Sequence, residues 1–282
     1  MYFIAFSFFI ILNCGKKVPN CGEKAPNQKN KFGNVPCDSI SPLSQYDFIT
    51  VTMIDRERNI RKDTVIRKIE KNISVFIPCK KYIYKALYYD KKGNLLSNNQ
   101  ILMMSTGKRW EFDDNQDEII VQYEYTDKQK KIISRYFEKN QFPNHTWQKQ
   151  IKTGVIENVE EVWMHPFRSN QYIFTEIAPF PKIEYPLKIN EKWYSSLDIG
   201  GGWGIWSNTS GRSSYEVVSK ENLKFPFSSK KIECYKIQSK ARFDFGASSL
   251  TFLFSREYGF LKKEYLFYTG DKLEIILQEI RY

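Results

Sequence analysis

The chain has 282 residues, of which 41% are hydrophobic and 27% charged, a balance that supplies a globular core and excludes wholesale disorder. Lys and Arg outnumber Asp and Glu by 43 to 32. Because the basic residues are spread along the whole sequence, this surplus predicts a solvated surface and no nucleic-acid-binding stripe. Aromatic residues reach 16%, and they favour pleated sheets and contact with apolar ligands.

The first residues predict export from the cytoplasm. Residues 2–12 form an uncharged apolar run that is shorter than the roughly 20 residues of a transmembrane helix but matches the core of a signal peptide. The run stops at Cys14, and residues 11–14 resemble the lipobox of bacterial lipoproteins, with Asn13 where Gly, Ala or Ser is usual. The resemblance implies that residues 1–13 are a signal peptide and that Cys14 carries the lipid, palmitate included.

A lipid on Cys14 would anchor the protein in the cell envelope. The expected location is the bacterial outer membrane or a periplasmic face, in preference to the inner membrane. Acyl chains contribute about 0.8 kcal/mol per buried CH2, so a multiply acylated cysteine holds a domain at a membrane. The alternatives are an ordinary signal peptide, which would give a secreted protein, and a buried N-terminal strand.

Residues 14–44 are rich in Lys, Asn, Pro and Gly and predict a flexible tether. If Cys14 is lipidated, four cysteines remain, and four cysteines allow three pairings. Cys21 and Cys37 flank a loose segment that a disulfide would staple. Cys79 and Cys234 lie in strand-like surroundings and are either paired or buried as free thiols. The sequence has no CxxC pair, which argues against a structural zinc site and a thioredoxin-like site.

Residues 45–282 predict an antiparallel β-domain, with a division into two sub-domains near 140–190 as an alternative. Apolar and polar residues alternate over 118–125 and 272–278, as in a half-buried strand. Turn residues separate the candidate strands every 10 to 12 residues or so, and the 3.6-residue helical period is missing. The further candidates are 48–54, 73–77, 82–89, 160–164, 172–177, 215–219, 232–239, 250–255 and 260–268.

The expected fold is therefore mainly β, an antiparallel meander forming a curved sheet, half-barrel or sandwich. Short helical turns are expected only around 114–117 or 127–134. The Gly- and Trp-rich block of residues 193–206 predicts a structural corner in preference to a ligand site. At the C-terminal hairpin, Leu250, Phe252 and Phe254 should share a buried face, with the turn at Gly259.

Two segments near the C-terminus resemble a pattern of uncharacterised periplasmic and envelope β-proteins. Residues 234–237, Cys-Tyr-Lys-Ile, precede residues 256–260, Arg-Glu-Tyr-Gly-Phe, which form an aromatic hairpin signal. Those proteins have curved antiparallel sheets, similar to the half-barrel of lipoprotein carriers of the LolA/LolB type. The resemblance implies a fold class and not an activity.

No catalytic or metal-binding pattern emerges from the sequence. The two histidines, His145 and His165, have no HxH or HxxxH spacing, so no metal site is expected. The Gly run of residues 200–204 lacks the context of a phosphate-binding loop, and no GxSxG motif is present. Acidic neighbours predict solvated edges, because adjacent residues on a strand point to opposite faces; they are Asp113-Asp114, Asp117-Glu118 and Glu160-Glu161.

These observations favour a non-enzymatic exported lipoprotein without a cofactor. It would bind an apolar or amphiphilic ligand, or a partner protein of the envelope, on a concave sheet. A structural or assembly factor that works through a sheet edge is the second hypothesis. A hydrolase of envelope glycans is the third, and it would require two carboxylates that converge in a groove.

Overall fold

The computed structural model describes residues 45–54, 60–142 and 146–282. The predicted signal peptide, Cys14, the tether with Cys21 and Cys37, and His145 lie outside these residues. No helix in the described ranges is long and apolar enough to cross a bilayer.

The described chain is built mainly of strands, with one α-helix, α1 (Asp127–Lys139), and two short 3-10 helices, η1 (Asn170–Ile177) and η2 (Gly204–Trp206). The strands are β1 (Tyr46–Ile54), β2 (Ile60–Glu70), β3 (Lys81–Tyr89), β4 (Leu95–Trp110), β5 (Asp113–Tyr123), β6 (Gln150–Glu157), β7 (Glu161–Met164), β8 (Lys182–Glu184), β9 (Lys192–Ile199), β10 (Thr209–Lys224), β11 (Lys231–Phe243), β12 (Gly246–Ser255), β13 (Gly259–Leu266) and β14 (Lys272–Arg281).

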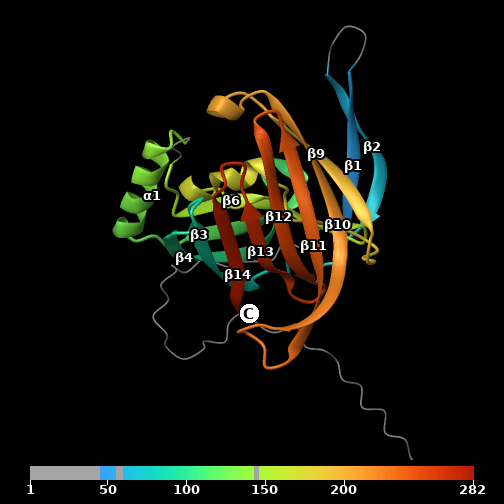
Figure 1. The fold of residues 1–282 in the computed structure, drawn as a ribbon. Helices are drawn as coiled ribbons and strands as arrows, with labels where there is room; N and C mark the ends of the chain where they lie inside the picture. The colour runs from blue at the N-terminus through green and yellow to red at the C-terminus, as the bar shows by residue number, and fades with distance from the viewer. Residues whose placement is uncertain (1–44, 55–59, 143–145) are drawn as a thin grey trace, which may run out of the picture.

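Twelve strands form one antiparallel sheet in the order β8-β7-β6-β5-β4-β3-β14-β13-β12-β11-β10-β9. The sheet consists of two meanders, β3–β8 and β9–β14, which are joined by the pairing of β14 with β3. In this pairing Lys272 lies opposite Tyr89 and Arg281 opposite Lys81. It curls so far that it nearly closes (Figure 1), which confirms the mainly β, curved antiparallel fold expected from the sequence. The hairpin of β1 and β2 is a separate sheet on the side of the molecule away from α1 (Figure 1).

The inner face of the sheet carries a large aromatic core. On β3 the alternate residues Tyr82, Tyr84 and Tyr88 are each at most 1% exposed, as the two-residue repeat of a strand requires. The C-terminal hairpin follows its prediction: Leu250, Phe252 and Phe254 are buried. Gly259 makes the turn with a φ of +76°, a conformation that favours glycine.

Helix α1 closes one end of this core. Thr126 caps the helix in a capping box with Gln129, which satisfies amide donors of the first turn. Ile133 and Phe137 are fully buried, and the Phe137 ring packs against Phe174 of η1 at 5.6 Å. The short helix expected around 127–134 is therefore confirmed and is longer than expected.

Two predicted strands and one predicted helical turn are wrong. Residues 172–177 belong to η1, in which every residue is buried. Their apolar residues therefore reflect burial on all sides of this helix and not the alternation of a strand. Residues 73–77 form a bend whose backbone amides donate to Glu157. Residues 114–117 belong to β5.

Five strands were not expected from the sequence: β2, β4, β6, β8 and β9. In β4, residues 101–105 are buried on both faces, because Leu102 and Met104 form a second small cluster with Ile83. Burial on both faces removes the polar-apolar alternation by which a strand is recognised.

Candidate functional site

The two edges of the twelve-stranded sheet face one another at a seam between β8 and β9. These strands are consecutive in the chain but are not hydrogen-bonded to each other. A hydrogen bond spans the seam: the Tyr215 hydroxyl of β10 donates to the backbone carbonyl of Phe180 at 3.0 Å. The Tyr215 ring stacks on Trp193 of β9 with ring centres 5.4 Å apart, which fixes where that hydroxyl points.

A pocket of about 320 Å³ opens at the seam, and we call it the seam pocket. Its wall from β5–β8 is partly aromatic, and its wall from β9 and β10 contributes serine hydroxyls. Residues on both sides of the seam line it: Gln116, Ile156, Glu161, Trp163, Ala178, Phe180, Lys182, Ser195, Ser196, Leu197 and Ser213. The volume lies at the small end of the range for ligand pockets in proteins.

Gln116 lines the seam pocket and carries a buried side-chain oxygen without a hydrogen-bond partner in the described structure. The side chain is 8% exposed, and its Nε2 donates to Asp113 Oδ2 at 2.8 Å. Its Oε1 accepts no hydrogen bond from the described residues, whereas buried polar atoms are nearly always paired. The amide lies against Gly154 of β6, where a Cβ atom would come within 1.8 Å of Gln116 Oε1, so only glycine leaves room for it.

The two charged residues that line the seam pocket, Glu161 and Lys182, compensate one another. Lys182 Nζ lies 3.2 Å from Glu161 and 2.7 Å from Glu184. Burial lowers the pKa of Lys182, but the bond to Glu184 and the nearby Glu161 carboxylate outweigh it and raise that pKa above its usual value. With one carboxylate and one ammonium in its lining, the seam pocket suits an uncharged ligand better than an ion.

His165 packs against the aromatic wall of the seam pocket and is partly buried. Its ring contacts Trp163 at 4.6 Å and Phe180 at 5.9 Å. Its Nδ1 lies 2.9 Å from an Arg168 nitrogen; because arginine only donates, Nδ1 accepts and the proton sits on Nε2. Burial, then the Arg168 charge, lowers the pKa of His165 to about 3, so the ring is neutral. Within the described residues no three potential metal ligands gather.

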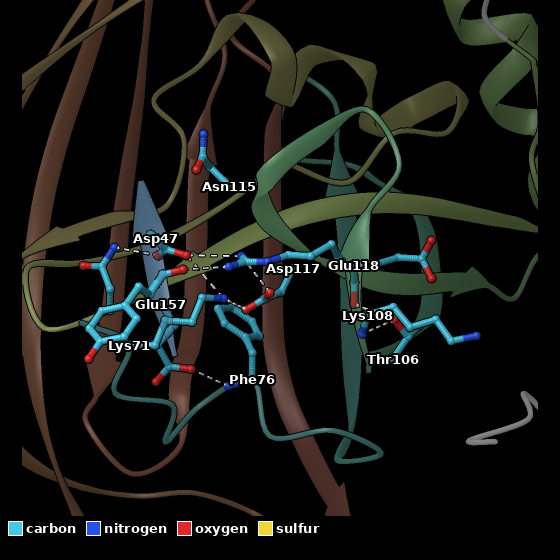
Figure 2. A network of polar contacts seen from close by, with 12 residues as sticks. Asp47, Lys71, Phe76, Thr106, Lys108, Asn115, Asp117, Glu118 and Glu157 are labelled. Atoms are coloured by element: carbon cyan, nitrogen blue, oxygen red, sulfur yellow. Dashed lines mark hydrogen bonds and ion pairs between the residues drawn. The ribbon is translucent and has the colours of Figure 1, made fainter. Parts of the chain in front are cut away.

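A second polar cluster fastens the β1–β2 hairpin to the sheet (Figure 2). Lys71 pairs with Asp117 and lies 3.4 Å from Asp47. Arg109 lies 3.1 Å from both carboxylates, and Asn158 donates to Asp47 at 2.9 Å. Two cations and two carboxylates balance, and the exposed fractions of the lysine and both acids are 5% or less. We call this cluster the hairpin clasp, and its role is structural: it attaches the hairpin to the sheet.

The carboxylate of Glu157 is held by three backbone amides and one hydroxyl, that of Ser74 at 3.0 Å. It accepts from the amides of Ser74, Val75 and Phe76, each at 2.8 Å; Figure 2 shows the bond from Phe76. The three amides form a concave anion site that Glu157 already fills, and the bond ties residues 74–76 to the end of β6.

Asp117 and Glu118, adjacent acidic residues of β5, point to opposite faces of their strand, as the predicted strand geometry requires, and they pair with different cations. Asp117 joins the hairpin clasp, whereas Glu118 pairs with Lys152 at 3.0 Å. Asp117 and Glu118 are 3% and 5% exposed, so the prediction of a solvated edge is wrong for this pair. Glu160 pairs with Arg67 and Glu161 with Lys182. No two of these carboxylates converge on a groove in the described structure.

The Gly- and Trp-rich block divides between a strand and a packed corner. Residues 192–199 form β9, and Trp206 of η2 is fully buried. The Trp206 ring packs on Phe174 at 5.4 Å, and its Nε1 donates to the Tyr268 hydroxyl at 3.2 Å. The block is thus built into the end of the core beside α1.

Two cysteines lie in the described ranges. Cys79 is disulfide-bonded, while Cys234 is a buried free thiol whose pKa burial raises to about 11.

The comparisons with known proteins found no matching family model and no matching curated protein. Among solved structures, a candidate lipoprotein from Parabacteroides distasonis is similar with a TM-score of 0.40 and 11% identity, over 75% of this chain and 100% of that one. A candidate exported protein with a YmcC-like fold from Bacteroides fragilis gives 0.36 and 9%, over 74% and 100%.

The hypothetical lipoprotein YmcC from Escherichia coli gives a TM-score of 0.31 and 8% identity, over 74% of this chain and 90% of that one. Scores of this size describe a loose likeness between folds, so the function is inferred below from the residues of the seam pocket.

Proposed function

We propose that this chain is a non-enzymatic exported lipoprotein that binds a small amphiphile in the seam pocket. The observation that carries the proposal is the unpaired acceptor of Gln116, a residue that lines the same pocket as the aromatic side chains of Trp163 and Phe180. An apolar wall with a few placed polar groups is the usual make-up of a small-molecule site. The sheet edges turn toward each other at this site, which favours ligand binding over an assembly factor with a long free edge.

The lining also defines the chemistry of the ligand. Gln116 Oε1 needs a donor, so the ligand carries a hydroxyl or amide N–H. The compensated pair of Glu161 and Lys182 disfavours a net charge, and Trp163 with Leu197 accepts an alkyl or ring surface. A pocket of about 320 Å³ holds a head group with a short chain, not a whole phospholipid. The ligand class is thus an uncharged amphiphile with a hydrogen-bond donor.

Titration with 1-monooctanoylglycerol, an uncharged probe with two hydroxyls, tests the proposal by calorimetry. We expect saturable 1:1 binding that Gln116→Leu weakens about tenfold, because a buried ligand hydroxyl then loses its acceptor at a cost of about 1–3 kcal/mol. Trp163→Ala should also weaken binding through lost apolar contact.

Gln122→Leu is the matched control for Gln116→Leu. Gln122 lies on the same strand and its Oε1 likewise lacks a partner in the described structure, but it does not line the seam pocket. Its replacement should leave probe affinity unchanged. Failure of the probe to saturate, or equal losses in the two glutamine variants, would refute binding at this site.

A further inference from the structure

The outer face of the sheet carries two adjacent rows of residues that its register brings together. In antiparallel pairs, residues directly opposite one another point to the same face. One row crosses eight strands, from β9 to β4: Tyr194, Ser214, Lys240, Ser249, Leu266, Lys272, Tyr89 and Leu95. The adjoining row runs Ser196, Arg212, Arg242 and Ala247. We call these twelve residues the outer rim.

Large apolar side chains are exposed along the outer rim. Tyr194 is 72% exposed, Leu95 52% and Leu266 45%. They alternate along the row with polar and basic residues, so that no continuous apolar groove forms. Ile132 of α1, 38% exposed, lines the same shallow surface hollow as Leu95 and extends the apolar edge onto the helix.

The outer rim is also strongly cationic. Its four charged residues are Arg212, Lys240, Arg242 and Lys272, all exposed, and it holds no carboxylate. Arg212 lies directly opposite Arg242, an arrangement of like charges that destabilises a free sheet. Across the described ranges neither guanidinium is paired with a carboxylate.

The nearest acidic row does not neutralise this charge. Glu216, Glu264 and Glu274 lie two residues further along their strands, on the same face. Glu216 pairs with Lys192 at 3.5 Å and Glu264 with Lys262 at 2.9 Å. These acids bound the outer rim on one side, and on the other Asp198 and Asp244 lie two residues beyond Ser196 and Arg242. In the described structure none of these acids forms an ion pair with a cation of the rim.

We propose that the outer rim is a contact surface for an anionic phospholipid bilayer. Guanidinium and ammonium groups match phosphate head groups, and tyrosine with exposed leucine suits the interface between head groups and acyl chains. A polyanionic glycan or an acidic protein would use the charge but would leave Tyr194 and Leu266 without a role. The proposal concerns a different face from the seam pocket and does not depend on it.

Vesicle sedimentation tests the outer rim in the full chain carrying Cys14→Ala, so that no lipid on that residue contributes. We expect binding to vesicles of phosphatidylglycerol and phosphatidylethanolamine above that to phosphatidylcholine alone. Arg212→Glu with Arg242→Glu should lower the partition coefficient at least tenfold, since each basic residue near an anionic surface contributes on the order of 1 kcal/mol.

The matched control uses a second like-charge pair on the same two strands. Lys224 lies opposite Lys231, both are exposed, and Lys224→Glu with Lys231→Glu makes the same change of net charge at the other end of the hairpin. This variant should keep most of the binding. An equal loss in both variants would show that net charge alone drives binding and would overturn the outer rim as the contact surface.

The apolar component has its own variant, Tyr194→Ser with Leu266→Ser. Both side chains are exposed, so the fold should tolerate the change. We expect this variant to bind the anionic vesicles more weakly than the starting protein. The decrease in binding should depend less on salt concentration than the decrease caused by the arginine substitutions. Unchanged binding in this variant would identify the partner as a soluble polyanion and refute the bilayer. The bilayer would also be refuted if the starting protein showed no preference for anionic vesicles.

Discussion

Lys263 lies in the aromatic core at 1% exposure, on the same face of β13 as Leu261 and Tyr265. Its ammonium is 4.3 Å from the centre of the Phe167 ring and 4.8 Å from that of Tyr84. Phe260 at 5.9 Å and the Met164 sulfur at 3.7 Å complete its surroundings. In the described structure no carboxylate accompanies it, and burial lowers the pKa of Lys263 to about 7.

This pKa predicts a pH-dependent stability. An unfolded lysine has a pKa of about 10.4, so between pH 7 and pH 10 the unfolded chain binds more protons than the folded one. The free energy of unfolding then rises with pH across this window and is flat below it with respect to this group. Lys263→Met should raise stability at pH 7 by about 1–4 kcal/mol and remove the slope, as measured by urea unfolding at pH 7 and pH 9.5.

Lys262→Met is the control at the neighbouring position. Lys262 lies on the outer face and pairs with Glu264 at 2.9 Å, so its loss should change stability by about 0.5 kcal/mol or less. A loss of stability in Lys263→Met at pH 7 would contradict the prediction and reveal an anion in the core.

At the scale of elements, the β1–β2 hairpin depends on the hairpin clasp. An isolated two-stranded hairpin is marginal in water, and Figure 1 shows it standing beside the main sheet and not within it. Beyond the clasp, the amide of Val159 donates to the Glu70 carbonyl at 3.0 Å, and that of Phe48 donates to Asn115 at 3.1 Å.

Lys71→Met should release the hairpin and leave the sheet folded. Asp47 and Asp117 would then share only Arg109, and breaking a buried ion cluster by removing one partner costs about 3–5 kcal/mol. Hydrogen exchange should accelerate in β1 and β2 and stay slow in β12 and β13.

Arg67→Met tests whether any ion pair near the hairpin would have the same effect. The Arg67–Glu160 pair is about half exposed on both sides, 51% and 46%, and should contribute less than about 1 kcal/mol. Faster exchange in this variant than in Lys71→Met would assign the attachment to the surface pair and not to the clasp.

At the scale of the whole molecule, Cys14→Ala tests the anchor. If Cys14 carries a lipid, the variant should move from the membrane fraction to the soluble fraction with its β-sheet circular dichroism intact. Peptide mapping of the wild type should then find Cys79 joined to Cys21 or Cys37. Unchanged fractionation, or a Cys14–Cys79 bridge with no lipid mass, would refute the lipoprotein proposal.

The sequence alone determined the features that depend on one-sided burial. Alternation over residues 250–255 and 260–268 placed Leu250, Phe252 and Phe254 in the core and Gly259 in the turn. The same pattern predicted the antiparallel class and the mainly β content. These features are local. A strand with one buried and one solvent-exposed face shows the alternation of apolar and polar residues in its own sequence, whichever strands it pairs with.

Only the tertiary structure decided the rest. Residues 101–105 of β4 are buried on both faces and the residues of η1 are all buried, so neither segment shows a polar-apolar period. The seam pocket joins Gln116 to Ser195, residues about 80 positions apart, once the chain's last strand has paired with β3. The high aromatic content was the only signal of a binding surface in the sequence. Basic residues that look dispersed in the sequence become neighbours through register, as Arg212 and Arg242 do. Such features arise because strand pairing, not local sequence, sets which distant residues share a face.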